Sequence, residues 1–215
     1  MRRIAIIGAM LILSACGSTS TQPHASSPAP SPAIGTTTSN SSATAGTSPE
    51  CGKPAGEIQQ LVCQDPQLSA LDQRLQVAYR QALDRPGADK AALQAAQNGW
   101  ATTRDQCVQN TDTRTCLTQA FQTRLVQLAL ADPATPAPPV VTYRCPPENG
   151  PLTAQFYNEL DPQTAVLTWK GDPYILFVQP SGSGARYGRQ GIEYWEHQGE
   201  VRLDFNGTQF VCTTA

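Results

Sequence analysis

The chain has 215 residues, of which 40% are hydrophobic and only 15% charged, and its formal net charge is -2. This length allows one or two domains. The chain has 15 Lys and Arg against 17 Asp and Glu, so it lacks the excess of positive charge with which nucleic-acid-binding proteins contact phosphates, and we expect no nucleic-acid partner. The two histidines, His24 and His197, lie outside any cluster with metal-ligand spacing, so we expect no metal, no cofactor and no Ser/His catalytic triad. Seven cysteines are an odd number, so one of them needs a role outside intramolecular disulfides.

The N-terminus has the pattern of an export signal. Two arginines precede the apolar run 4–13, which is too short to span a bilayer and suits the hydrophobic region of a signal peptide. The run ends in Leu13-Ser14-Ala15-Cys16, which resembles the bacterial lipobox, whose cysteine is diacylated after removal of the signal. We predict a signal peptide over 1–15 and a lipid on Cys16 that anchors the exported chain on the extracytoplasmic side of the cell membrane. An ordinary secretory signal and a twin-arginine signal are the alternatives.

A segment without core-forming residues follows. Residues 16–50 consist mainly of Ser, Thr, Pro, Ala and Gly, and Glu50 is their only charged residue. Such a composition predicts a disordered linker. Its root-mean-square reach is roughly 30 Å, from about 5–6 Å times the square root of the residue number. The Ser and Thr content also suits O-glycosylation, but a bare spacer is the simpler interpretation.

Residues 51–131 show helical periodicity. Asp65-Pro66 has the form of an N-cap followed by proline at the first helical position, and apolar residues then recur at spacings of three and four. Pro86-Gly87 breaks this helix, a second follows, and a third runs from about Cys116 until Asp132-Pro133 stops it. The pattern predicts a small three-helix module.

Once Cys16 is acylated, six cysteines remain in an oxidising compartment, which predicts three disulfides. Antiparallel packing of the first two predicted helices favours a Cys63–Cys107 pair, and with it a Cys51–Cys116 pair. Pairing of sequence neighbours is the alternative, and spacing alone does not decide between them. Zinc binding by these four cysteines is disfavoured, because no C-x-x-C spacing occurs.

A proline-rich connector over 132–142 leads into a module over 143–215 with strand-like alternation. Asn206-Gly207 is a strong hairpin signal, and Cys145 and Cys212 are placed to join the ends of the module. We predict a small antiparallel β-barrel, and hence an α+β chain of two domains stapled by disulfides. Seven strand-like segments are present: 142–145, 152–157, 165–169, 174–178, 192–195, 201–205 and 209–212.

The glycine-rich segment 181–188 interrupts the alternation of apolar and polar residues that is typical of strands. Its composition allows a protruding loop with unusual backbone angles. A plain surface loop is the simplest interpretation. A phosphate-binding loop is disfavoured, because no lysine-serine ending and no helix follow.

Two sets of motifs resemble known families. The helical module contains Cys63-Gln64-Asp65-Pro66-Gln67-Leu68, Trp100 and Arg104-Asp105-Gln106-Cys107, and in these it resembles the N-terminal domain of LprI-type lysozyme inhibitors. The β module contains Tyr143-x-Cys145, the stretch Ser183-Gly184-Ala185-Arg186-Tyr187, Tyr194-Trp195 and Cys212, and in these it resembles the MliC family of membrane-bound inhibitors of c-type lysozyme.

The resemblance implies an eight-stranded barrel that inhibits host c-type lysozyme without catalysis of its own. In the MliC family a loop serine and a downstream lysine reach the two carboxylates of the enzyme. Ser183 matches the serine, whereas the lysine position falls on His197, which departs from the family pattern. Histidine as a residue type is cationic only towards acidic pH, so we expect its contribution to grow as the pH falls. The implied lysozyme-binding residues are Gly182, Ser183, Gly184, Arg186, Tyr187 and His197.

Other functions remain in competition at this point. An envelope carbohydrate-binding or adhesion lipoprotein would use exposed aromatic residues such as Trp169 and Tyr187. An enzyme built on Asp and Glu is disfavoured, because no pair of these residues stands out. Because c-type lysozyme is strongly basic, Glu193, Glu196 and Glu200 are candidates for steering its approach.

Overall fold

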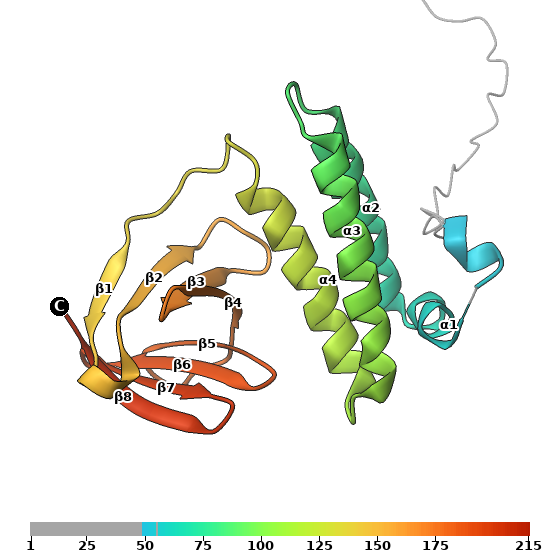
Figure 1. The fold of residues 1–215 in the computed structure, drawn as a ribbon. Coiled ribbons are helices and arrows are strands. Elements are labelled where there is room, and N and C mark those ends of the chain that lie inside the picture. Colours follow the sequence, from blue (N-terminus) through green and yellow to red (C-terminus); the bar gives the residue numbers. More distant parts are fainter. Residues whose placement is uncertain (1–48, 55) are drawn as a thin grey trace, which may run out of the picture. The chain divides into compact units, whose positions relative to one another are not determined.

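The computed structural model describes residues 49–54 and 56–215. The predicted signal peptide, Cys16 and the linker up to residue 48 lie outside the described residues. Within the described part, helices precede strands along the chain (Figure 1), and the two regions have separate hydrophobic cores. None of the described helices combines the length and the apolar character that crossing a membrane requires.

Four α-helices and two short 3-10 turns make up the helical module. They are the 3-10 turn Pro49–Gly52, α1 (Glu57–Gln64), α2 (Pro66–Asp84), α3 (Lys90–Asp105), the 3-10 turn Gln106–Gln109 and α4 (Thr113–Leu130). The predicted fold class is confirmed, but α1 adds a helix to the three expected. The reason lies at Asp65, which ends α1 and caps α2, accepting hydrogen bonds from the amides of Gln67 (2.8 Å) and Leu68 (3.1 Å).

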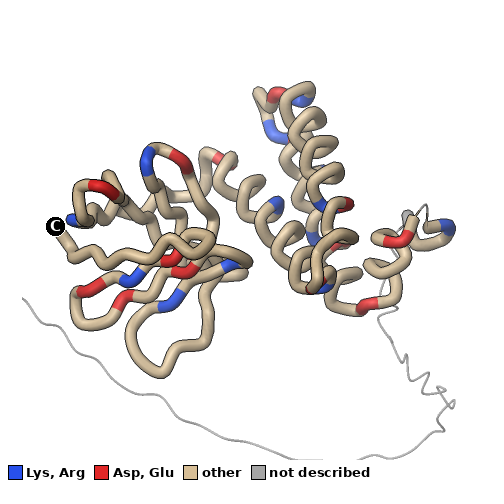
Figure 2. The backbone as a smooth tube through the Cα atoms, turned by 60° about the horizontal axis from the view of Figure 1, so that its bottom comes forward, with Lys and Arg blue, Asp and Glu red and all other residues tan. Residues whose placement is uncertain are grey.

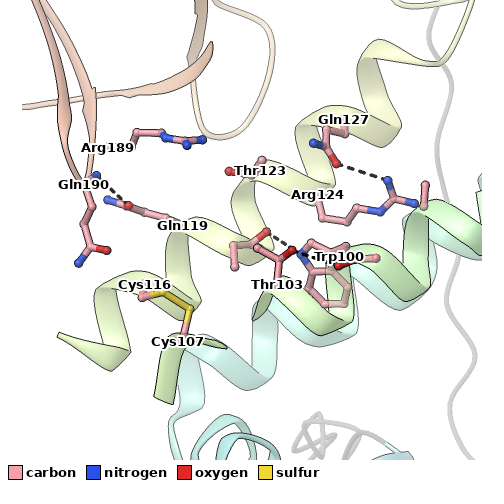
Figure 3. A pocket seen from close by; sticks show the side chains of 13 residues that line it. Trp100, Thr103, Cys107, Cys116, Gln119, Thr123, Arg124, Gln127, Arg189 and Gln190 are labelled. Atoms are coloured by element: carbon pink, nitrogen blue, oxygen red, sulfur yellow. Dashed lines mark hydrogen bonds between the residues drawn. A yellow bond between two sulfur atoms is a disulfide. The ribbon is translucent and has the colours of Figure 1, made fainter. Parts of the chain in front are cut away.

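The core of the helical module lies mainly between α2 and α4. Leu68 and Leu75 of α2 pack with Leu117 and Phe121 of α4, and all four are fully buried. Helix α3 contributes no fully buried residue. It is held by Trp100, whose ring meets Phe121 edge-on at 5.4 Å and whose indole N–H donates to the carbonyl of residue 120 at 2.9 Å (Figure 3).

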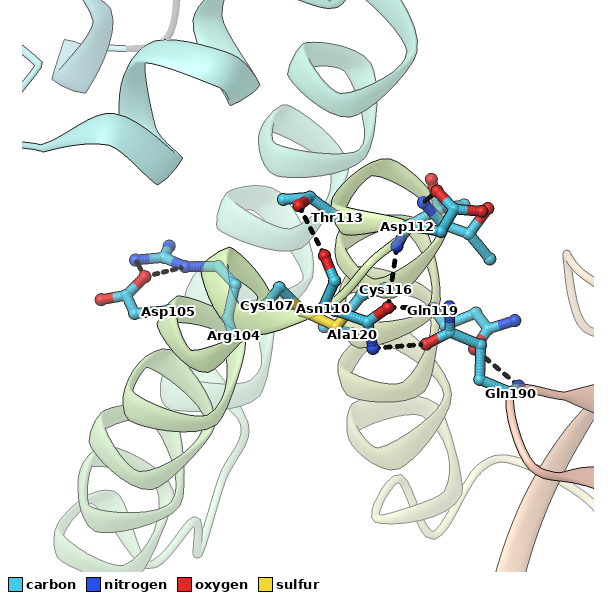
Figure 4. The surroundings of a disulfide bond; sticks show 12 residues. Arg104, Asp105, Cys107, Asn110, Asp112, Thr113, Cys116, Gln119, Ala120 and Gln190 are labelled. Atoms are coloured by element: carbon cyan, nitrogen blue, oxygen red, sulfur yellow. Dashed lines mark hydrogen bonds and ion pairs between the residues drawn. A yellow bond between two sulfur atoms is a disulfide. The ribbon is translucent and has the colours of Figure 1, made fainter. Parts of the chain in front are cut away.

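The disulfides of the helical module join sequence neighbours, as Cys51–Cys63 and Cys107–Cys116. Figure 4 shows the second of them. The favoured pairing, Cys63–Cys107 with Cys51–Cys116, is therefore wrong. It assumed that Cys63 stands at the start of the helix that faces the helix of Cys107. Instead Cys63 lies on the separate helix α1, and each disulfide ties a 3-10 turn to the helix that follows it.

Eight antiparallel strands close into a barrel in which each strand pairs with its sequence neighbours and β1 pairs with β8. The strand missing from the sequence prediction is β5, which overlaps the second half of the glycine-rich segment. The strands are β1 (Val141–Arg144), β2 (Leu152–Tyr157), β3 (Thr164–Trp169), β4 (Asp172–Val178), β5 (Ala185–Arg189), β6 (Ile192–His197), β7 (Glu200–Phe205) and β8 (Thr208–Thr214).

Tight turns set the register of the barrel. Lys170-Gly171, Gln198-Gly199 and Asn206-Gly207 each join two strands, and both residues of each turn have positive φ, as type I′ hairpins require. The Cys145–Cys212 disulfide is confirmed, and it links the chain just after β1 to β8 where the barrel closes.

Candidate functional site

The connection between β4 and β5 is the one long loop among the strands β3 to β8. Its base is closed by Gln179, whose amide donates to the carbonyl of Arg186 at 2.8 Å and whose side chain donates to the carbonyls of Phe177 (3.2 Å) and Gly188 (3.4 Å). Beyond this base, residues 180–184 are exposed. We call Ser181–Gly184 the serine-glycine loop.

The two serines of the loop have different roles. The Ser181 hydroxyl donates to the carbonyl of Ser183 at 2.5 Å, which folds the loop on itself. The hydroxyl of Ser183 makes no hydrogen bond within the part of the chain that the structure describes. Ser183 therefore presents an exposed group that can both donate and accept.

Gly184 brings the loop against the end of β6. It has a φ of +68°, and a Cβ atom at this position would collide with the carbonyl oxygen of Glu196 and lie 3.2 Å from the Cα of His197. Only glycine fits such a contact without displacing the backbone. The structure thus brings Gly184, next to Ser183, and His197 together, although 13 positions separate Gly184 from His197 in the sequence.

Trp195 of β6 holds the loop from outside the barrel. Its indole N–H donates to the carbonyl of Ser183 at 3.1 Å. Its ring packs against the His197 ring at 5.9 Å with an interplanar angle of 25°, and the Arg202 guanidinium lies 5.6 Å from its centroid. Sequence reasoning missed this role, although the alternation of buried Ile192 and Tyr194 places Trp195 on the outer face of β6.

Arg186 and Tyr187 point to opposite sides of β5. Arg186 forms an exposed ion pair with Glu193 at 2.8 Å, and this hydrogen bond raises the pKa of the guanidinium. Tyr187 is only 6% exposed and packs against Phe156 and Tyr194 in the barrel core, where desolvation raises the pKa of its phenol. Its ring supports the barrel wall beneath the loop and is not placed for direct contact with a partner.

The two aromatic residues considered for glycan binding are also packed inward. Trp169 stacks on Phe205 at 4.2 Å and on Phe210 at 5.5 Å, and the ammonium of Lys170 lies 4.7 Å from its ring. With Tyr187 in the core, neither ring offers the open face that sugar stacking needs.

Charge on the barrel is mixed and slightly acidic. Residues 141–215 contain eight Asp and Glu against five Lys and Arg, and both kinds are spread over the barrel (Figure 2). Three of the acidic residues, Glu193, Glu196 and Glu200, lie on β6 and at the start of β7. Glu200 is the register partner of His197 and Glu196 precedes it in β6, whereas Glu193 lies further along β6 and pairs with Arg186.

The barrel is small and closed, and it presents one exposed loop that Gly184 and Trp195 hold in place, as in a domain that binds a partner through a loop. Residues 143–210 match the model of MliC, described as the membrane-bound lysozyme inhibitor of c-type lysozyme, and residues 51–128 match the model of the lysozyme inhibitor LprI. The chain is 60% identical over 215 residues, all of both chains, to lipoprotein LprI of Mycobacterium tuberculosis and of Mycobacterium bovis. It therefore belongs to the LprI family of lysozyme inhibitors. No solved structure matches the chain.

Proposed function

We propose that this protein is an envelope lipoprotein that inhibits c-type lysozyme by placing the serine-glycine loop in the active-site cleft of the enzyme. The observation that carries the proposal is the exposed Ser183 hydroxyl, which has no hydrogen-bond partner among the described residues and sits on a loop fixed by Gly184 and Trp195. Both family models describe lysozyme inhibitors, which supports the choice of enzyme. In this function the chain binds and does not catalyse.

The chemistry of the target suits this loop. C-type lysozyme cleaves its glycan with two carboxyl groups, one protonated and one ionised. A serine hydroxyl can donate to the ionised group or accept from the protonated one. At Gly182 nothing lies within 4 Å of where a Cβ atom would be, so the loop is slender at the point where it would replace a sugar.

His197 is the neighbouring group that would supply a cation. Gly184 packs against the backbone of His197, and the His197 ring stacks on the ring of Trp195. Contacts with Gly184 and Trp195 therefore position both the loop and the imidazole. A protonated imidazole would form a charge-assisted hydrogen bond with the ionised carboxylate. The surrounding glutamates would favour approach of a basic enzyme.

The N-terminal segment would determine where the protein is located. An acylated Cys16 would anchor the protein on the extracytoplasmic side of the membrane, and residues 17–48 would hold the folded part clear of the membrane surface. Both segments lie outside the described residues.

The test is lysis of bacterial cell walls by c-type lysozyme in the presence of the purified protein. Equimolar wild-type protein is expected to suppress lysis, and Ser183→Ala to weaken inhibition roughly ten- to hundredfold, because a hydrogen bond to a charged group contributes about 1.5–3 kcal/mol. Thr208→Ala, at an exposed position beside the β7–β8 turn at the other end of the barrel, is the matched control and should inhibit as the wild type does.

Two results would count against the proposal in different ways. Undiminished lysis at equimolar protein would contradict inhibition itself. Equal inhibition by the wild type and Ser183→Ala would leave inhibition standing and remove the loop from its mechanism.

A further inference from the structure

A charged residue lies on the core-facing side of α4. Leu117, Phe121 and Leu128 are buried at helical spacing along this helix, and Arg124 occupies the same stripe with only 5% of its surface exposed. Lysozyme inhibition through the barrel loop makes no use of this residue. A cation at a core position of a small helical module needs an explanation of its own.

The partners of Arg124 are all neutral. Its Nε donates to the side-chain oxygen of Gln97 at 2.9 Å, while its two terminal nitrogens reach the Gln127 side chain (Figure 3) and the carbonyl of Leu93 only at 3.4 and 3.5 Å. Five ion pairs occur among the described residues, and none includes Arg124. Burial lowers the pKa of this guanidinium, which nonetheless stays charged in proteins. The charge is therefore buried without an anion, which is costly.

A hollow of about 440 Å³ adjoins Arg124 within the helical module. Its walls are mainly apolar and include Ala82, Ala92, Leu93 and Leu128. Helix α3, which contributes no fully buried side chain, forms one wall of the hollow. Its volume is within the range of about 300–1,000 Å³ that small-molecule sites occupy.

We infer that this hollow binds a small aliphatic monocarboxylate, whose carboxylate pairs with the Arg124 guanidinium and whose apolar body fills the space beside α3. A guanidinium presents its donors in a fork that matches a carboxylate. The pairing would give the buried cation the anion that the described residues do not provide.

The rim of the hollow favours a single negative charge. Arg85, the other arginine of the lining, already contacts the Asp132 carboxylate at 3.6 Å and donates to the carbonyls of Leu128 and Ala131 at 3.3 and 2.9 Å. Asp89 adds a second carboxylate at the rim, where it caps α3. A doubly charged phosphate would be repelled by the carboxylates of Asp89 and Asp132. Among the described residues of the lining, Arg124 would be the one cation without an ion pair that could hold the phosphate.

Aliphatic carboxylates have two natural sources, which are fatty acids and the C-termini of short peptides. Both share the chemistry that Arg124 recognises. Octanoate and N-acetyl-alanyl-alanine are therefore suitable probes, and octanamide is the matched neutral control for the first of them.

The experiment measures binding of the probes to the purified protein by calorimetry and by shifts of the amide signals around the hollow. We expect saturable binding of one of the two carboxylates, none of octanamide, and at least a tenfold loss in Arg124→Gln. Arg80→Gln is the control, because Arg80 is exposed on α2 and does not line the hollow. It should bind as the wild type does.

A second variant keeps the test valid if Arg124→Gln fails to fold. Ala92→Phe changes an exposed position of α3 that lines the hollow, so it should block binding while Arg124 and the fold remain. Which of the two carboxylates binds identifies the source. The inference is overturned if neither carboxylate binds saturably, if octanamide binds equally well, or if binding survives both Arg124→Gln and Ala92→Phe. Lysozyme inhibition is not measured, so these outcomes are independent of the proposed function.

Discussion

His197 is the residue at which this chain departs from the lysine that its resemblance to the MliC family implies. A lysine carries its charge at every physiological pH, whereas an imidazole gains its charge on acidification. The structure places His197 beside the serine-glycine loop, in contact with Trp195 and next to Glu196 in the sequence. A histidine at this position thus leaves a residue that can carry a positive charge beside the loop.

This difference predicts a pH-dependent inhibitor. Histidine as a residue type gains its charge towards acidic pH, so the ratio of wild-type inhibition to that of His197→Ala should rise as the pH falls from 8 to 5. A rise of roughly three- to tenfold is expected from one added charge-assisted hydrogen bond. Taking the ratio at each pH cancels the titration of the enzyme itself.

His197→Lys provides the matched control for this prediction. It should inhibit with no extra gain in acid, because its charge is already present at pH 8. A ratio that stays constant between pH 8 and 5 would show that His197 supplies no charge to the complex.

At the scale of elements, the serine-glycine loop is positioned by strand β6 as well as by the two strands that it joins, β4 and β5. Trp195 reaches from β6 to the carbonyl of Ser183, and Gly184 packs on the carbonyl of Glu196. A loop fixed before binding avoids the entropy cost of ordering in the complex. The anchoring strand should therefore influence inhibition without touching the enzyme's carboxylates.

Trp195→Phe tests this anchoring. The phenyl ring preserves an aromatic surface for His197 but loses the hydrogen bond to Ser183, so we expect inhibition weakened about two- to tenfold, the value of one net hydrogen bond. The melting temperature should change little, because Trp195 lies on the outer face. Lysozyme inhibition and thermal unfolding are the two measurements.

Trp169→Phe is the contrasting variant. The Trp169 indole donates to the carbonyl of Asn149 at 2.7 Å and stacks in the barrel core, so its loss should lower stability and leave inhibition unchanged. The reverse pattern, with Trp195→Phe unfolding early and Trp169→Phe losing inhibition, would contradict the assigned roles.

Local signals predicted some elements and missed others for identifiable reasons. Asp65-Pro66 and Asn206-Gly207 were informative, because caps and type I′ turns depend on residues close in sequence. Strand β5 was missed, since glycines at 182, 184 and 188 mask its alternation and its pairing with β6 is a tertiary effect. The Cys51–Cys63 and Cys107–Cys116 pairs depend on where short 3-10 turns fold back, which spacing does not reveal.

The candidate site was predictable only in part. Ser183 and His197 are expected at the site from a family resemblance and stay a prediction, and the structure adds that both contact Trp195. Tyr187 was expected at the binding surface but packs in the core, because strand alternation in β5 turns it inward. Arg124 was not singled out at all, since a lone arginine in a helical pattern normally faces solvent.

At the scale of the whole molecule, the chain has two disulfide-bonded modules with separate cores. They follow an N-terminal segment whose sequence predicts a lipid anchor and a linker. The barrel carries the loop on which the proposed inhibition rests. The helical module carries a buried cation and a hollow that the barrel mechanism does not use. This division predicts that variants around Arg124 leave lysozyme inhibition intact.

The central claim is that the loop occupies the cleft where lysozyme binds its glycan. The most direct measurement is the affinity of the protein for c-type lysozyme at increasing concentrations of a chitin trisaccharide, used as a glycan ligand of that cleft. The account predicts competition, with the apparent Kd of the wild-type protein rising in proportion to the trisaccharide concentration once the cleft is saturated. Simultaneous binding of the protein and the trisaccharide, with an unchanged Kd, would contradict it.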